Sequence, residues 1–194
     1  MAMLHLENLT PHQEEIYKQI VGKPRIDVRA PAGAGKTFLA LKVMFEELDT
    51  EAGGAVAFTT RNLALCLHVT KWLFIRLEQR YDTKTAARLI ESRFFMLFSP
   101  FKDGLRRVTV DEERGCIVAG KALGWDANAS LALLVVDEAH HVHAAGELEP
   151  IVDKFAPVTS STHLLLLSDV SQSGEIEMSQ VRNGSNSYYK IKNY

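Results

Sequence analysis

Short apolar runs alternate along the chain with longer segments in which apolar residues recur at helical spacing. Three runs are apolar throughout or nearly so, at 55–58, 131–136 and 163–167, and a fourth, at 25–29, alternates apolar and polar side chains. Continuous apolar runs are typical of parallel strands that are covered on both faces, and the segments between the runs are rich in helix formers. The pattern therefore predicts an α/β fold with a mainly parallel central sheet.

The segment from about 81 to 130 has a less regular pattern. A helix is expected over 85–91 and a strand over 93–98, and two apolar stretches on either side of a charged turn indicate a β-hairpin over 105–118. The hairpin region is locally basic and has aromatic residues nearby, which we interpret as a solvated face above core aromatics. We expect this segment to be a small insertion in one domain that extends over residues 1–178.

Composition narrows the class of protein. Apolar residues make up 46% of the 194 residues and charged residues 24%, as in ordinary soluble domains, and the net charge of −2 gives no strong footprint for a polyanionic partner. No apolar run has membrane-spanning length and the N-terminus lacks the layout of a signal peptide, so an intracellular location, in the cytoplasm or nucleus, is expected. The thiols of Cys66 and Cys116 match no metal or redox spacing, and both are expected to be buried. Residues 179–194 are polar and are expected to form a tail in loop or disordered conformation.

A glycine-rich turn between the first expected strand and the following helix carries the strongest chemical signal. Its residues are Ala30-Pro31-Ala32-Gly33-Ala34-Gly35-Lys36-Thr37. This is the P-loop pattern, with alanine at its first glycine, in the strand–turn–helix context that the pattern requires. Backbone N–H groups of such a turn cradle phosphate, the lysine reaches the β- and γ-phosphates, and the threonine hydroxyl binds Mg²⁺. The residues expected to bind the nucleotide are Gly33, Ala34, Gly35, Lys36, Thr37 and Phe38.

Two adjacent carboxylates, Asp137 and Glu138, follow the apolar run at 131–136. Adjacent carboxylates at the end of a buried strand are unfavourable without a cation, and Mg²⁺ supplies one. We expect Asp137, together with Thr37, to hold the metal and Glu138 to polarise the attacking water. The histidines at 140, 141 and 143 do not have the spacing of a closed zinc site and no cysteine is near, so zinc is not expected.

Two glutamines have candidate roles beside the nucleotide. Gln13 completes a capping box with Thr10, which accounts for the residue structurally, and its amide could also read the donor and acceptor edge of adenine. Gln172 lies in the polar stretch after the run at 163–167, where a strand of an α/β sheet opens into the ligand crevice. It could contact the γ-phosphate or its attacking water.

These motifs together resemble the first RecA-like domain of a superfamily 1 helicase or translocase. The resemblance rests on Gln13, on the P-loop, and on three further motifs, Phe58-Thr59-Thr60-Arg61 (motif Ia), Val136-Asp137-Glu138-Ala139-His140 (motif II) and Leu167-Ser168-Asp169-Val170-Ser171-Gln172 (motif III). Alanine at the first P-loop glycine is familiar in that family. Ser168 stands where that family usually has glycine before the motif III aspartate. Motif II spells the DEAH box of superfamily 2, so the assignment to superfamily 1 rests on the P-loop and motif III.

The resemblance implies a three-layer P-loop NTPase fold and an ATPase that uses ATP and Mg²⁺. It implies the roles of Gln13 as an adenine contact and of Lys36, Glu138 and Gln172 as catalytic residues. It also implies single-stranded nucleic acid, DNA or RNA, as a partner, and a second RecA-like domain in cis or trans that completes the site. A nucleotide-dependent switch that acts on protein partners is the alternative, and the low net charge favours it slightly.

Overall fold

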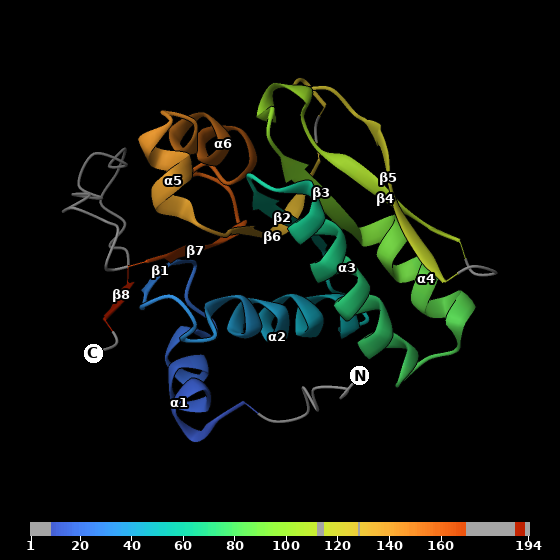
Figure 1. Ribbon diagram of the computed structural model, residues 1–194, viewed down its shortest axis with the longest axis horizontal. Coiled ribbons are helices and arrows are strands. Elements are labelled where there is room, and N and C mark those ends of the chain that lie inside the picture. Colours follow the sequence, from blue (N-terminus) through green and yellow to red (C-terminus); the bar gives the residue numbers. More distant parts are fainter. Residues whose placement is uncertain (1–8, 112–114, 128, 170–188, 193–194) are drawn as a thin grey trace.

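The apolar runs form the strands of one sheet that lies between two layers of helices (Figure 1). The computed structural model describes residues 9–111, 115–127, 129–169 and 189–192. The strand order is β5-β4-β3-β2-β6-β7-β1-β8. The strands are β1 (Arg25–Arg29), β2 (Ala55–Thr60), β3 (Phe94–Phe98), β4 (Arg106–Asp111), β5 (Cys116–Ala122), β6 (Leu131–Val136), β7 (His163–Ser168) and β8 (Tyr189–Lys192).

Helices cover both faces of this sheet, and each face has its own apolar core. The helices are α1 (Pro11–Ile20), α2 (Lys36–Asp49), α3 (Leu63–Glu78), α4 (Thr83–Arg93), α5 (Ala139–Ala144) and α6 (Leu148–Phe155), with one 3₁₀ turn at Phe101–Asp103. The first core joins α1 to α4 to one face, and the second joins α5 and α6 to the other. Strand β7 shows the division, since Leu165 and Leu167 belong to the first core and Leu164 and Leu166 to the second. The predicted three-layer, mainly parallel α/β fold is confirmed.

The segment over 81–130 extends the sheet at one edge. Strand β3 pairs in parallel with β2, and the predicted hairpin is the antiparallel pair β4–β5, which continues the sheet beyond β3. Helix α6 begins at Leu148, and a further short helix, α5, lies between β6 and α6. The apolar pattern did not indicate α5 because it has only six residues.

Two expectations need correction. Residues 189–192, inside the expected polar tail, form strand β8 and pair in parallel with β1, and the rest of that tail lies outside the described residues. Cys66 is buried as expected, whereas Cys116 is exposed, because it begins β5, the outermost strand, on which residues 116 and 118 both face solvent.

Among the described residues no helix is long and apolar enough to cross a bilayer.

Candidate nucleotide site

The sheet order brings three chemically important strand ends together. Strand β7 lies between β1 and β6, with Arg29 of β1 level with Ser168 of β7 and Val136 of β6 level with Leu166 of β7. The backbone N–H of Ala30 continues this pairing and donates to the Ser168 carbonyl over 3.2 Å. The P-loop, motif II and the start of motif III therefore meet at the carboxyl edge of the sheet, where open α/β sheets bind ligands.

The P-loop has the backbone that its glycines predict. Gly33 and Gly35 have φ values of 76° and 83°, in the left-handed region that glycine adopts readily, and Gly35 is the residue that precedes α2. The Lys36 side chain folds back over the loop, and its Nζ donates to the carbonyls of Ala30 at 2.7 Å and Pro31 at 3.0 Å. The lysine is therefore buried at the loop, beside the position where a phosphate would accept the same protons.

Thr37 and Asp137 connect the P-loop to motif II. The Thr37 hydroxyl donates to Asp137 Oδ2 over 3.0 Å, and the Asp137 backbone N–H donates to the Thr59 carbonyl of β2 over 2.8 Å. Burial raises the pKa of the Asp137 carboxyl, and the hydrogen bond from Thr37, the N–H of Glu138 and the charge of Lys36 act in the opposite direction. A buried carboxylate beside a hydroxyl is a donor set of hard oxygen atoms, and it fits Mg²⁺.

Glu138 has a constrained backbone. Its φ is 51° and its ψ is 42°, and among the described residues it is the one non-glycine residue with a positive φ. Its N–H donates to Asp137 Oδ1 over 3.0 Å and its carbonyl accepts the N–H of His141 over 2.8 Å. Left-handed backbone in a residue with a side chain stores strain and is often found at functional sites. The Glu138 side chain is 44% exposed, so solvent water can reach its carboxylate.

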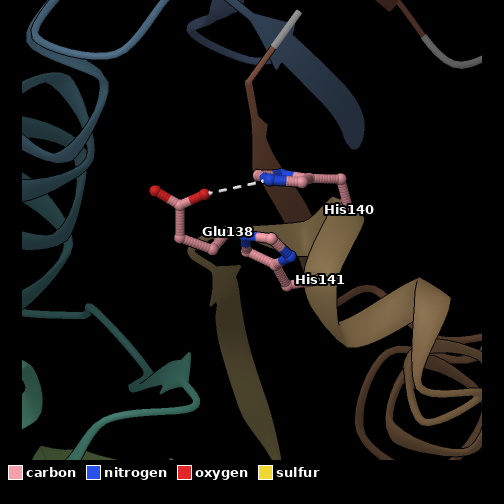
Figure 2. Close-up of side chains that lie close together, drawn as sticks. All are labelled: Glu138, His140 and His141. Atoms are coloured by element: carbon pink, nitrogen blue, oxygen red, sulfur yellow. Dashed lines mark ion pairs between the residues drawn. The ribbon is translucent and has the colours of Figure 1, made fainter. Parts of the chain in front are cut away.

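The histidines after Glu138 have different environments. His140 is buried, and its Nε2 lies 3.3 Å from Glu138 Oε2, as Figure 2 shows, while His143 Nδ1 lies 2.8 Å from the carboxylate of Glu149. Potential ligand atoms of Glu138, His140 and His141 lie within 4.8 Å of one another. Sequence analysis included His140 in motif II and discounted it as a zinc ligand, but gave it no role beside Glu138. Its position two residues after Glu138 was the signal that could have linked it to that carboxylate.

Gln13 lies at the P-loop and also caps a helix. Its Oε1 accepts the Thr10 N–H over 2.9 Å, and its own N–H donates to the Thr10 hydroxyl over 3.3 Å, which completes the predicted capping box. Its Nε2 approaches Gly35 so closely that a Cβ added there would lie 2.1 Å from it. The side chain therefore uses its oxygen for the cap and presents its amide nitrogen to the loop.

A cavity of about 340 Å³ lies between α1, α2 and α3. Phe38, the residue after Thr37, lines this cavity with Tyr17, Phe45 and Trp72, and charged side chains such as Glu14 and Arg76 complete its wall. Aromatic walls with polar groups at the edge suit a planar heterocycle.

Comparison with known proteins shows the family of the chain. A family model described as an AAA domain matches residues 8–187. The chain belongs to this AAA family. The match confirms the resemblance inferred from the motifs at the level of a P-loop domain of AAA type. A search of curated proteins finds no match.

Two solved structures were found to be similar to this AAA domain, each at 16% identity. One is the Pif1 helicase from Candida albicans, with a TM-score of 0.40 over 84% of this chain and 32% of that chain. The other is a large terminase ATPase domain from Thermus phage P74-26, with a TM-score of 0.42 over 83% of this chain and 65% of that one. The chain thus spans about a third of the helicase and 65% of the terminase domain.

The remaining motifs of the AAA domain are only partly at the site. Thr59 and Thr60 of motif Ia are buried in β2, while Arg61 is exposed after it. Helix α3 is capped by Asn62, whose side-chain oxygen accepts the N–H of Ala64 over 2.8 Å. Gln172, the expected γ-phosphate contact, lies outside the described residues.

Proposed function

We propose that this AAA domain binds ATP with Mg²⁺ and hydrolyses it. In this proposal it is the N-terminal motor half of a superfamily 1-like helicase or translocase that acts on single-stranded nucleic acid. The observation that carries the proposal is the 3.0 Å contact between Thr37 and Asp137. It brings the hydroxyl of the P-loop and the carboxylate of motif II to one point, as shared coordination of a phosphate-bound Mg²⁺ requires.

The residues of the chain have separate roles in this reaction. Lys36 exchanges its hydrogen bonds to the carbonyls of Ala30 and Pro31 for hydrogen bonds to phosphate oxygens. Its positive charge then neutralises part of the negative charge of the phosphates in the loop. Thr37 and Asp137 would hold Mg²⁺, which neutralises charge on the β- and γ-phosphates when bound. Glu138 accepts a hydrogen bond from the attacking water and takes up its proton. Gln13 and Phe38 would contact the base, and Gln172 the γ-phosphate.

Slow hydrolysis is expected for the isolated chain. The transition state spreads negative charge over the γ-phosphoryl oxygens, and an arginine supplied by a neighbouring domain or partner is worth about 10³–10⁵ in rate. The Arg29 guanidinium is buried, and its Nε lies 2.6 Å from Asp27 Oδ2, so it already pairs with a carboxylate of the same strand. We therefore propose that a second RecA-like domain, in cis or in trans, completes the site.

Calorimetry with Mg²⁺-ATP tests the binding step. Lys36→Ala is expected to weaken ATP on the order of a hundredfold, because a charge-assisted contact to phosphate is lost. Lys71→Ala, which removes an exposed lysine on α3, is the matched control and is expected to bind as the parent does. Equal affinity of Lys36→Ala and the parent would refute the P-loop assignment.

Single-turnover hydrolysis tests the chemical step. The single-turnover rate constant of the parent is expected to lie below about 1 s⁻¹, the low end of ordinary enzyme rates, and Glu138→Gln is expected to reduce it to a small residual rate. Single-stranded DNA and RNA are then added to the chain with a second RecA-like domain supplied. Stimulation by either supports a motor, whereas hydrolysis that neither nucleic acid changes would favour the switch on protein partners.

A further inference from the structure

The end of β7 is joined to Glu138 through one buried ring. The backbone N–H of Asp169, directly after β7, donates to Nδ1 of His140 over 3.3 Å. The opposite ring nitrogen, Nε2, lies 3.3 Å from Oε2 of Glu138, and Figure 2 shows the two side chains extending toward each other. His140 is 4% exposed, so the ring has little freedom to leave this position.

The contact at Nδ1 decides which nitrogen carries the proton. Since a backbone N–H donates to Nδ1, that nitrogen must present its lone pair, and the neutral ring then carries its hydrogen on Nε2. The Nε2–H faces the Glu138 carboxylate, which can only accept when ionised. The same tautomer disfavours a metal site at Glu138, His140 and His141, because a protonated Nε2 has no lone pair for a metal.

Glu138 needs such a partner because only its backbone is fixed. The backbone hydrogen bonds hold the Cα in a left-handed conformation, but a glutamate side chain that is nearly half exposed samples several rotamers in water. A carboxylate that polarises water must stay within hydrogen-bond reach of that water, and a misplacement of about 1 Å can reduce the rate by about a hundredfold.

We propose that His140 is a positioning residue for Glu138. It donates from Nε2 to the carboxylate, while the Asp169 N–H at Nδ1 fixes the ring and its tautomer. The position of the Glu138 carboxylate is therefore set by the end of β7. The same end of β7 pairs with the first P-loop residue, because the N–H of Ala30 donates to the Ser168 carbonyl. This inference rests on the proposed ATPase function of the same site.

Two amide substitutions separate the two arms of the ring. His140→Gln extends an amide N–H₂ to about the position of Nε2 and keeps a donor for Glu138, whereas His140→Asn keeps an acceptor near Nδ1 and is too short to reach Glu138. We expect the asparagine variant to lower the single-turnover rate constant by tenfold to a hundredfold, with ATP affinity within about twofold of the parent. The glutamine variant is expected to keep this rate constant within about threefold of the parent. Equal losses in both variants, in proportion to their melting temperatures, would show a packing role only and overturn the proposal.

A double variant tests whether His140 acts through Glu138. If it does, adding His140→Asn to Glu138→Gln changes the residual rate by less than about twofold, because the carboxylate is already gone. A further tenfold loss would overturn the proposal. An inactive parent, or a Glu138→Gln variant as active as the parent, would refute the proposed function. If the parent is active and His140→Asn keeps the single-turnover rate constant of the parent, this inference alone is refuted.

The tautomer is measurable without any activity. Long-range ¹H–¹⁵N spectra of ¹⁵N-histidine-labelled protein, assigned with His140→Gln, are expected to show His140 with the proton on Nε2 and an unprotonated Nδ1. A proton on Nδ1 would overturn the proposal even if the asparagine variant fails to fold.

Discussion

Thr37 and Asp137 are 100 residues apart in the sequence, and the hydroxyl of one donates to the carboxylate of the other over 3.0 Å. Asp137 is 2% exposed, and burial raises the pKa of its carboxyl above the ordinary value of 3.8. A carboxyl whose folded pKa is raised favours the folded state below its unfolded pKa, and this contribution is lost as the pH rises through the folded pKa. At neutral pH without a cation, the charged Asp137 therefore destabilises the fold.

We expect Asp137→Asn to melt at a higher temperature than the parent at pH 7 without Mg²⁺, and the difference to shrink as the pH approaches 4. The same variant is expected to lose the additional stabilisation that Mg²⁺ gives to ADP-bound parent protein. Thermal melts over a pH series, with ADP alone and with Mg²⁺-ADP, measure both effects. A lower melting temperature combined with full Mg²⁺ stabilisation would show that Asp137 is not a ligand.

Strain at Glu138 gives a second prediction. A residue with a Cβ costs about 1–2 kcal/mol in left-handed backbone, and glycine does not. Glu138→Gly and Glu138→Ala lose the same carboxylate, so both are expected to lose hydrolysis. The glycine variant is expected to be about 1 kcal/mol more stable than the alanine variant, which raises the melting temperature by about 2–4 °C in a chain of this size. Equal melting temperatures would show that no strain is stored there.

Local patterns predicted the strands, the P-loop and the position of the two motif II carboxylates, because each depends on residues close in sequence. The strand order depends on pairing between distant segments, so the apolar runs did not indicate that β7 inserts between β1 and β6. The sequence did contain the signal for β8, since Tyr189-Lys190-Ile191-Lys192 alternates as an edge strand does, but its polar neighbours obscured it. The tautomer of His140 depends on a backbone N–H 29 residues away, which no motif encodes.

Arg93 gives a third prediction, about stability. Its guanidinium donates to four backbone carbonyls at the end of α2 and in the following loop, those of Glu47 (2.8 Å), Leu48 (3.1 Å), Thr50 (3.1 Å) and Gly54 (3.3 Å). The last carbonyls of a helix have no partner within the helix, and this one side chain donates to two of them, those of Glu47 and Leu48. The Thr50 carbonyl also accepts the backbone N–H of Gly53 over 2.9 Å.

Arg93→Ala is expected to lower the free energy of unfolding by about 2–4 kcal/mol in urea titrations. Arg93→Lys is expected to recover only part of it, because a single ammonium does not span four carbonyls. Arg88→Ala, at an exposed position on the same helix, is the control and should change stability by less than about 0.5 kcal/mol. If the free energy of unfolding of Arg93→Ala were no lower than that of Arg88→Ala, packing alone would account for the stability of the end of α2.

The last prediction separates the two roles of Gln13. Its Oε1 accepts the Thr10 N–H over 2.9 Å, while its Nε2 lies against Gly35 of the P-loop. Thr10→Ala removes the capping hydroxyl and keeps the Gln13 amide, and the loss of such a cap costs about 1 kcal/mol. Gln13→Ala removes its half of the capping box and also the amide nitrogen beside the loop. If the amide contacts the base, both variants lose similar stability, but only Gln13→Ala weakens ATP binding, by about fivefold to tenfold. Gln13→Ala is also expected to weaken ATP binding more than GTP binding, because adenine offers both a donor and an acceptor to an amide. Melting temperatures and calorimetric affinities for the two nucleotides provide the comparison. Should the two variants bind ATP equally, or should Gln13→Ala weaken both nucleotides to the same degree, then Gln13 serves α1 alone.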